Sequence, residues 1–200
     1  PAGEYLIRGV TGSGKTEVYI ELIAHAVERG LQAIVLIPEI ALTYQTMMRF
    51  YHRFGGRVSV IHSKMSPGEK QDQFDRARAG DLDVMIGPRS ALFTPFARLG
   101  IIVIDEEHEE SYRSEQTPRY HAREVAQQRA KMEHAKLVLG SATPSLEASY
   151  AAESGSMTLI RMEKRAKAAS LPEVRIIDMR RELREGNTGI LSLELQEEMR

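Results

Sequence analysis

Short apolar runs alternate with segments of helical periodicity along most of the chain. The apolar runs predict strands, and several of the stretches between them repeat apolar residues at every third or fourth position, as helices do. This alternation is typical of βα units built on a parallel sheet. We therefore predict an α/β fold with a mostly parallel central sheet flanked by helices. The expected strands are Tyr5–Arg8, Ala33–Ile37, Val58–His62, Asp83–Gly87, Ile101–Asp105, Lys136–Gly140, Met157–Met162 and Val174–Asp178.

Two helices have clear boundaries in the sequence. The first is expected over Lys15–Arg29, just before a glycine. The second begins where Ser66 can cap the helix and Glu69 can complete a capping box, and Gly80 ends it. The strand beginning at Ile101 is apolar on both faces, so it should be central and covered by helices on both sides.

The pattern weakens after about Glu163, where basic residues stand among alanines and a loop-like run follows. We expect one compact domain over residues 1–162 and a connecting tail over residues 163–200. The chain begins with Pro1 and stops at Arg200 inside an amphipathic helical pattern with no capping signal after it. We therefore expect a piece of a longer protein.

Composition excludes several classes of function. Lys and Arg number 27 and Asp and Glu number 28, a net charge of −1, so any affinity for nucleic acid must come from a local patch. The chain has no Cys, which excludes disulfides, zinc–thiolate sites and thiol nucleophiles. The apolar runs are far shorter than the about 20 residues that span a bilayer, and the first residues do not form a signal peptide. We expect a cytoplasmic protein with no membrane partner.

A phosphate-binding pattern follows the first expected strand. Residues 9–16 fit GxxxxGK[ST] and open a helix, the context in which such a loop binds phosphate through its backbone N–H groups and the helix N-terminus. Lys15 would bind the β- and γ-phosphates, and the Thr16 hydroxyl would ligate Mg²⁺. The alternative is a chance glycine-rich turn. The expected nucleotide-binding residues are Gly9, Thr11, Gly12, Ser13, Gly14, Lys15 and Thr16.

Acidic residues follow the most hydrophobic strand, in the run DEEH over residues 105–108. An acid at such a strand end can hold magnesium opposite a phosphate loop, and we assign this role to Asp105. Glu106 can polarise the attacking water as a general base. The expected catalytic residues are thus Lys15, Asp105 and Glu106. The alternative is a solvated acidic loop, which we favour for Glu109 and Glu110.

Polar residues follow two further strands and are candidates for contacts with a nucleic-acid backbone. After the second expected strand, backbone N–H groups and the Thr43 hydroxyl can face a phosphate. After the fourth expected strand, Arg89 offers a charged contact. Such contacts read no sequence, as suits a motor that steps over every base. The alternative is a pair of well-capped loops without a ligand. The candidates are Pro38, Glu39, Thr43, Arg89 and Ser90.

Rings and cations gather shortly after the DEEH run. Aromatic faces stack on unpaired bases at roughly 1–3 kcal/mol per base without reading them. A loop bonded to both nucleotide and strand can couple one to the other. The alternative, especially for Tyr120, is surface tyrosines packed on a helix. The residues concerned are Tyr112, Arg113, Arg119, Tyr120 and His121.

Six motifs in order resemble those of superfamily 2 DExH helicases, and among these the first motor lobe of the PriA family of replication-restart helicases (primosomal protein N-prime). They are GVTGSGKTEVY, PEIALT, IGPRSALFTPF, DEEHEESY, PRYHAREVA and GSATPS. The resemblance covers nearly all of the chain. It implies a RecA-like P-loop NTPase lobe that uses ATP and Mg²⁺, without zinc, to move 3′ to 5′ on single-stranded DNA and to restart stalled forks.

The same resemblance implies further roles and partners. Ser141 and Thr143 in GSATPS would couple hydrolysis to DNA, His108 would share that role, and residues 109–121 would sense DNA. From the residues alone, GSATPS is also a helix N-cap, and the two interpretations are compatible. Pro88 departs from the family pattern, in which a small residue or Thr is expected. Implied partners are single-stranded and forked DNA, a second helicase lobe and other domains of the parent chain, primosome proteins and single-strand binding protein.

Competing functions remain open at this point. A small-molecule kinase or a GTPase would share the phosphate loop, but the NKxD signature of GTPases is missing and a kinase would not need GSATPS or DEEH. A double-stranded DNA translocase of the same superfamily is a closer alternative. A nucleotide-binding scaffold with an inactive site is the third. The arginine finger and the adenine contacts are expected outside this chain.

Overall fold

The computed structural model describes residues 3–164 and 174–199. The chain divides into two compact units, residues 1–167 and 168–200, and each is described by itself. The expected strand Val174–Asp178 falls in the second unit, and the other expected strands fall in the first.

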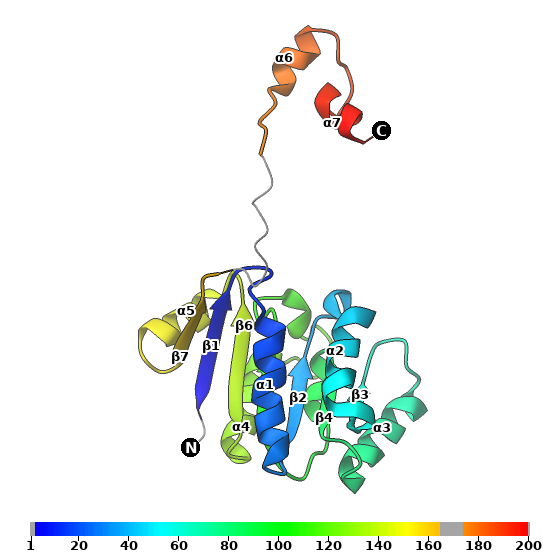
Figure 1. The fold of residues 1–200 in the computed structure, drawn as a ribbon, viewed down its shortest axis with the longest axis vertical. Coiled ribbons are helices and arrows are strands. Elements are labelled where there is room, and N and C mark those ends of the chain that lie inside the picture. The colour runs from blue at the N-terminus through cyan, green and yellow to red at the C-terminus, as the bar shows by residue number, and fades with distance from the viewer. Residues whose placement is uncertain (1–2, 165–173, 200) are drawn as a thin grey trace. The chain divides into compact units, whose positions relative to one another are not determined.

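The first unit is built on a seven-stranded sheet with the order β3-β4-β2-β5-β6-β1-β7 (Figure 1). Every neighbouring pair is parallel. The predicted α/β fold is therefore confirmed, and seven of the expected strands are present with ends shifted by one or two residues. Their bounds are β1 Glu4–Gly9, β2 Gln32–Leu36, β3 Val58–Val60, β4 Val84–Gly87, β5 Leu99–Ile104, β6 Lys136–Ser141 and β7 Thr158–Met162.

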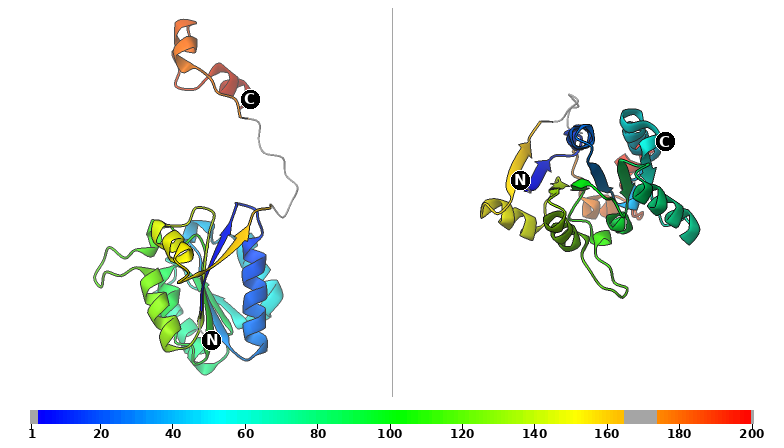
Figure 2. Two further views of the ribbon diagram at one scale, coloured as in Figure 1. Left: turned by 90° about the vertical axis from the view of Figure 1, so that its left-hand side faces the viewer. Right: turned by 90° about the horizontal axis from the view of Figure 1, so that it is seen from below.

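Helices cover both faces of the sheet (Figure 2). Helices α1 and α2 pack on one face, where Tyr19, Ile23 and Phe50 join one apolar cluster. Helices α4 and α5 pack on the other face with alanines, among them Ala126 and Ala148, that let them approach closely. No helix in the described part of the chain is long and apolar enough to cross a membrane. The bounds are α1 Lys15–Glu28, α2 Tyr44–Phe54, α3 Pro67–Ala79, α4 Ala122–Met132 and α5 Leu146–Glu153.

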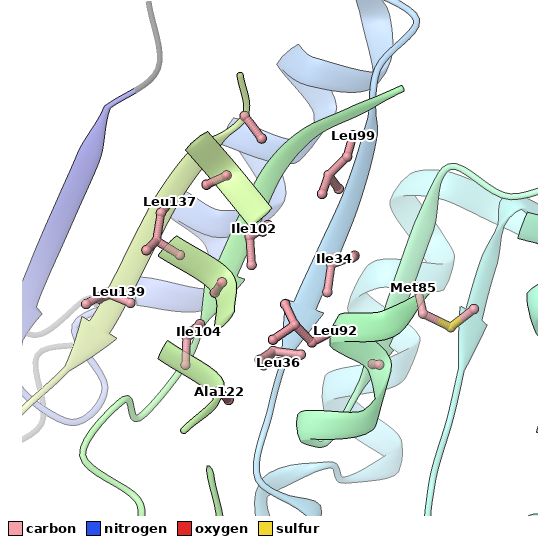
Figure 3. Close-up of a cluster of buried hydrophobic side chains, with 14 of the residues drawn as sticks. Ile34, Leu36, Met85, Leu92, Leu99, Ile102, Ile104, Ala122, Leu137 and Leu139 are labelled. Carbon is pink, nitrogen blue, oxygen red and sulfur yellow. The ribbon is translucent and has the colours of Figure 1, made fainter. Parts of the chain in front are cut away.

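Strand β5 is the middle strand of the sheet, as its unbroken apolar sequence predicts. Ile102 and Ile104 point into the cluster beneath α4, while Ile101 and Val103 point into the cluster beneath α1 (Figure 3). Both faces of the strand are thus buried, and its carboxyl end has a fixed position.

Local sequence sets the ends of α3. The side chain of Ser66 accepts a hydrogen bond from the Glu69 N–H, and the Glu69 carboxylate accepts one from the Ser66 N–H, which completes the predicted capping box. Gly80 ends the helix with a φ of 84°, a conformation that a side chain disfavours.

The second unit contains α6 (Met179–Arg184) and α7 (Leu193–Glu198). Here the expected strand Val174–Asp178 is wrong. Val174 and Ile176 are 80% and 93% exposed, and no strand in the described residues pairs with them. Apolar residues alone do not make a strand without a neighbour to complete its hydrogen bonds. Asp178 instead caps α6 by accepting a hydrogen bond from the Arg180 N–H.

We predict that Ile102→Ala lowers the free energy of unfolding by about 2–5 kcal/mol. The substitution leaves a cavity in the core beside the central strand, and the packed neighbours cannot easily move to fill it. The matched control is Ile160→Ala on the edge strand β7, where the side chain is 41% exposed and less is lost. Urea unfolding followed by circular dichroism measures both. Equal losses would show that β5 is not the centre of the core.

Candidate nucleotide site and neighbouring loops

Three of the sequence motifs follow three adjacent strands. The phosphate loop follows β1, GSATPS straddles the end of β6, and DEEH follows β5. Strand β6 lies between the other two, and all three are parallel. Their carboxyl ends therefore lie at one edge of the sheet, where parallel α/β proteins bind ligands.

Glycines give the phosphate loop its shape. Gly12 and Gly14 have φ values of 79° and 90°, and Gly14 is the N-cap of α1. A Cβ on Gly9 would lie 2.5 Å from the Ser13 Oγ, which is too close for any side chain. The loop therefore requires glycine at these positions for backbone and steric reasons, as a tight phosphate cradle does.

The loop fits an anionic ligand. Ser13 is buried, and within the described structure its Oγ is the one buried side-chain polar atom without a hydrogen-bond partner. An orphaned hydroxyl is costly unless a ligand satisfies it. The Lys15 side chain is buried as well, and its Nζ donates to the Gly9 carbonyl at 3.0 Å. A hydroxyl donor and an ammonium group thus face the same loop, which suits phosphate oxygens.

The phosphate loop and the DEEH run meet. Lys15 Nζ lies 3.5 Å from Glu106 Oε1, across the end of β6. A single nucleotide site requires these two distant segments to share one edge of the sheet, and the ion pair shows that they do. A buried cation and a partly buried acid from two distant segments therefore lie within one site.

Asp105 is held on several sides. Its Oδ1 accepts a hydrogen bond from the Tyr19 hydroxyl at 3.0 Å, and its backbone carbonyl accepts one from the Tyr112 hydroxyl at 2.7 Å. Its N–H donates to the Leu36 carbonyl in β2 at 2.9 Å. Burial raises the pKa of the Asp105 carboxyl, the neighbouring Glu106 raises it further, and Tyr19 and Lys15 oppose that rise.

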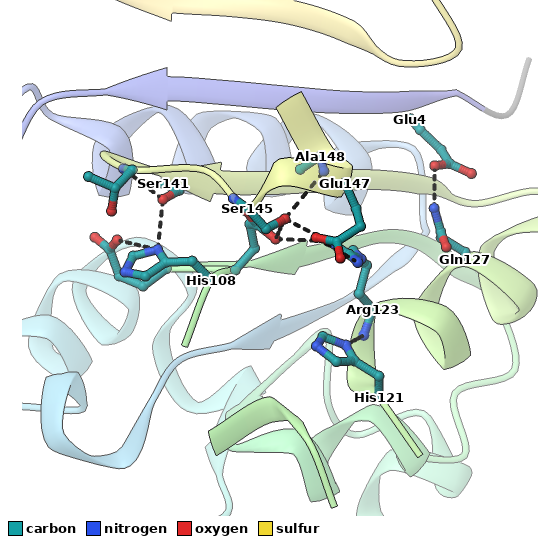
Figure 4. Close-up of polar contacts among 12 residues, drawn as sticks. Glu4, His108, His121, Arg123, Gln127, Ser141, Ser145, Glu147 and Ala148 are labelled. Atoms are coloured by element: carbon teal, nitrogen blue, oxygen red, sulfur yellow. Dashed lines mark hydrogen bonds and ion pairs between the residues drawn. The ribbon is translucent and has the colours of Figure 1, made fainter. Parts of the chain in front are cut away.

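Glu106 starts a chain of polar contacts. Its φ of 46° is unusual for a residue with a side chain, and strain of this kind gathers at functional sites. Its Oε2 lies 3.8 Å from His108 Nδ1, which in turn lies 2.8 Å from the Ser141 Oγ (Figure 4). Ser141 Oγ also accepts a hydrogen bond from the Thr143 N–H. The structure thus connects DEEH to GSATPS.

Magnesium would need ligands beyond the side chains. Among the described residues no group of three His, Asp or Glu side chains could hold a metal. Mg²⁺ commonly binds one or two carboxylates together with substrate phosphates and water. Asp105 and the partly buried Thr16 at the start of α1 fit such a site.

Glu107 is a site residue that the sequence analysis misses. Its carboxylate is buried and accepts hydrogen bonds from the Ser145 N–H at 2.7 Å and the Ser145 hydroxyl at 3.0 Å. Arg123 Nη1 lies 3.3 Å from Glu107 Oε2 and donates to the Ser145 Oγ at 2.7 Å (Figure 4). This group, which we call the Glu107 clamp, ties DEEH, α4 and the N-cap of α5 together. In the sequence alone Glu107 looks like its acidic neighbours.

The loop after β2 has local partners. Thr43 caps α2 by accepting from the Thr46 N–H, so the capping alternative holds for its hydroxyl. The two oxygens of Glu39 accept from the N–H and the hydroxyl of Ser63 at 2.6 and 2.7 Å. Glu39 therefore orients the loop after β3, and a direct phosphate contact through this carboxylate does not fit. Pro38 is buried at the strand end, where it supplies no N–H.

Arg89 and Tyr112 both have partners inside the first unit. Arg89 and Ser90 lie in the 3₁₀ turn Arg89–Phe93 after β4, and Arg89 Nη1 donates to the carbonyls of Ser111 and Arg113 at 3.0 and 2.6 Å. Tyr112, between them, is 1% exposed. The expectation that its ring stacks on a base is wrong for this structure, because the ring is in the core and its hydroxyl holds Asp105.

The aromatic-rich loop beyond Tyr112 projects from the unit. An antiparallel bridge pairs Arg113 with His121, and His121 caps α4 by accepting from the Arg123 N–H. Tyr120 packs edge-to-face against Phe93 with ring centroids 5.5 Å apart, so the packing alternative holds for its ring. Arg119 is exposed at the loop. The loop borders an open cavity of about 1080 Å³ that reaches back to His108 and Ser145.

We predict that Glu107→Gln lowers the free energy of unfolding by about 1–3 kcal/mol, because it removes the buried carboxylate that pairs with Arg123 and leaves that cation only the 3.8 Å contact to the exposed Glu147. The matched control is Glu110→Gln, an exposed acid three residues away, with an expected change within about 0.5 kcal/mol. Urea unfolding measures both. Equal stability of the two variants would contradict a structural role for the Glu107 clamp.

Comparison with known proteins places this geometry among helicases. The family model of DEAD/DEAH box helicases matches residues 2–150. The replication restart protein PriA of Bacillus subtilis is 48% identical over 195 residues, which are 98% of this chain and 24% of that protein. PriA of Synechocystis is 46% identical over 198 residues, 96% of this chain and 24% of that protein. The chain thus spans about a quarter of these relatives.

Solved structures agree in fold. RecG bound to a three-way DNA junction matches with a TM-score of 0.58 and 23% identity over 84% of this chain and 22% of that chain. The helicase domain of Pyrococcus furiosus Hef also matches with a TM-score of 0.58, at 17% identity over 80% of this chain and 35% of that chain. The predicted RecA-like architecture is therefore confirmed. On the match to its family model, the chain belongs to the DEAD/DEAH box helicases.

Proposed function

We propose that this chain is the ATP-binding lobe of a 3′–5′ DNA helicase that restarts stalled replication forks by coupling ATP hydrolysis to movement on single-stranded DNA. The observation that supports it most is the 3.5 Å approach of Lys15 to Glu106, which joins phosphate binding and water activation. The relatives that are 46–48% identical are named replication restart proteins. That name supports DNA as the nucleic acid along which this lobe would move.

The site residues divide the work of hydrolysis. The phosphate loop would bind the phosphates of ATP, with the Lys15 ammonium exchanging its contacts to Gly9 and Glu106 for phosphate oxygens. Glu106, once released by Lys15, would accept a proton from the attacking water. Thr16 and Asp105 would hold magnesium. Bound Mg²⁺ supplies neutralisation of the charge that develops on the phosphates.

A continuous set of contacts supports coupling to DNA. Arg89 bonds the backbone on both sides of Tyr112, and Tyr112 bonds the backbone of Asp105. A strand that displaced Arg89 from these carbonyls would loosen the support of the magnesium acid. On the other side His108 joins Glu106 to Ser141, beside Thr143. We propose these two routes as the links between strand binding and hydrolysis.

The motor would need parts outside this chain. We propose that residues 1–162 form the first lobe and that residues 163–200 lead toward a second lobe, which supplies an arginine finger. Single-stranded and forked DNA, primosome proteins and single-strand binding protein remain proposed partners. The cytoplasm remains the proposed compartment, since a DNA motor must reach the chromosome.

Two alternatives differ in measurable ways. A translocase on double-stranded DNA would move along duplexes without separating the strands, so strand displacement by the full-length protein distinguishes it. A scaffold with an inactive site would not need the Lys15–Glu106 pair. If the protein were such a scaffold, Glu106→Gln would leave its function unchanged.

We predict that Glu106→Gln in the full-length protein lowers kcat for DNA-stimulated ATP hydrolysis by about 10²–10⁴-fold while ATP still binds, because the general base is lost. Lys15→Ala should abolish ATP binding as well. Phosphate release measures the first effect and fluorescent-nucleotide titration the second. This 200-residue chain alone should hydrolyse ATP slowly, since an arginine finger can contribute about 10³–10⁵-fold. Rapid turnover that survives Lys15→Ala would contradict the proposal.

We predict that Arg119→Ala in the full-length protein weakens binding of single-stranded DNA to a similar extent for every sequence. The slope of log affinity against log salt should become shallower by about 1, the change expected when one phosphate contact is lost. The control is Lys131→Ala, an exposed cation in the last turn of α4. Fluorescence anisotropy at several salt concentrations measures both. Identical slopes for the two variants would remove Arg119 from the proposed DNA contacts.

A further inference from the structure

Tyr19 is a buried residue of α1 that the proposed mechanism does not yet use. It lies one turn beyond the phosphate loop, its side chain is 1% exposed, and its hydroxyl donates to Asp105 Oδ1 at 3.0 Å. The phenol O–H therefore reaches from the phosphate-loop helix to the acid that follows β5.

The sheet makes room for this bond at Gly140. A Cβ on Gly140 would lie 1.6 Å from the Tyr19 hydroxyl oxygen, 2.7 Å from the Tyr19 Cζ and 3.4 Å from Asp105 Oδ1. Gly140 does not have the positive φ that would by itself favour glycine. A side chain at residue 140 would occupy the space that the phenol needs, because the phenol crosses β6 at this point to reach the acid just after β5.

A tyrosine suits the position chemically. A buried carboxylate needs a hydrogen-bond donor to remain charged. A Lys or Arg in this place would satisfy it, but the extra positive charge would repel a metal ion. The phenol supplies a hydrogen bond without a charge, and its ring is fixed by packing in the cluster beneath α1. Tyr19 can thus hold the carboxylate while leaving its charge available for a cation.

We propose that Tyr19 is a positioning residue for magnesium: its hydroxyl fixes the orientation of the Asp105 carboxylate before the metal arrives. The inference rests on the proposed function, since it assigns Asp105 to the metal. Partners of this kind commonly change metal affinity by about 10–100-fold when they are removed. Because Tyr19 belongs to the helix that begins in the phosphate loop, the same element positions the phosphates and the metal acid.

The test is Tyr19→Phe in the full-length protein, which removes only the hydroxyl. With a non-hydrolysable ATP analogue present, electron paramagnetic resonance of free Mn²⁺ gives the metal affinity of the complex. We expect Mn²⁺ to bind about 10–100-fold more weakly, while binding of the analogue in excess EDTA is unchanged. The matched control is Tyr5→Phe. Tyr5 is a half-buried residue of β1 for which no hydroxyl hydrogen bond is found among the described residues, so Mn²⁺ affinity should be unaltered.

The outcomes separate the two proposals. If the unaltered protein binds Mn²⁺ with the analogue and Tyr19→Phe binds it equally well, the role of Tyr19 is overturned and the proposed function stands. If the unaltered protein binds neither, both fall. Should Tyr19→Phe not fold, as judged by circular dichroism, Gly140→Ala serves instead, because its methyl group would displace the phenol. Unchanged Mn²⁺ affinity in that variant overturns the inference.

Discussion

The site depends on the parallel alignment of β1, β6 and β5. Because these three strands are adjacent and point the same way, the phosphate loop, GSATPS and DEEH end at one edge although they are far apart in sequence. The separation that remains is the width of β6, and side chains bridge it. Lys15 reaches Glu106 above the strand end, and Tyr19 reaches Asp105 through the space at Gly140. A slip in register of β6 would break both bridges.

Asp105 is partly buried and Glu107 fully buried at this edge, and the structure compensates the two acids differently. The Asp105 carboxylate is held by a hydrogen bond from the neutral Tyr19 hydroxyl, and no ion pair within the described residues takes it up. Glu107 is paired with Arg123 and bonded twice by Ser145, so its charge is used within the protein. Burial without such partners would favour the protonated acids. Two acids only two residues apart therefore have different surroundings because different elements pack over them.

The same contrast explains which features the sequence predicts. Strand order cannot be derived from it, but the two-sided apolar pattern at Ile101–Ile104 predicts the central strand, and GxxxxGK[ST] predicts the phosphate loop, because each depends on local chemistry. Glu107, Tyr19 and the burial of Tyr112 depend on residues distant in sequence, and a single sequence contains no signal that separates them from exposed neighbours. The predicted strand containing Val174 and Ile176 is wrong for the same reason, because an apolar run becomes a strand only where a neighbouring strand pairs with it.

Under the proposed function, Asp105 is also where the nucleotide-binding loop and the DNA-facing loops meet. Its side chain is bonded to α1, the helix of the phosphate loop, while its carbonyl is bonded to Tyr112, which Arg89 holds from the end of β4. A shift in either helix or loop changes the support of one residue. In a packed interior such shifts are discrete and not gradual. In the proposed motor, an acid supported from both sides would therefore report strand binding to the nucleotide without any movement of the sheet itself.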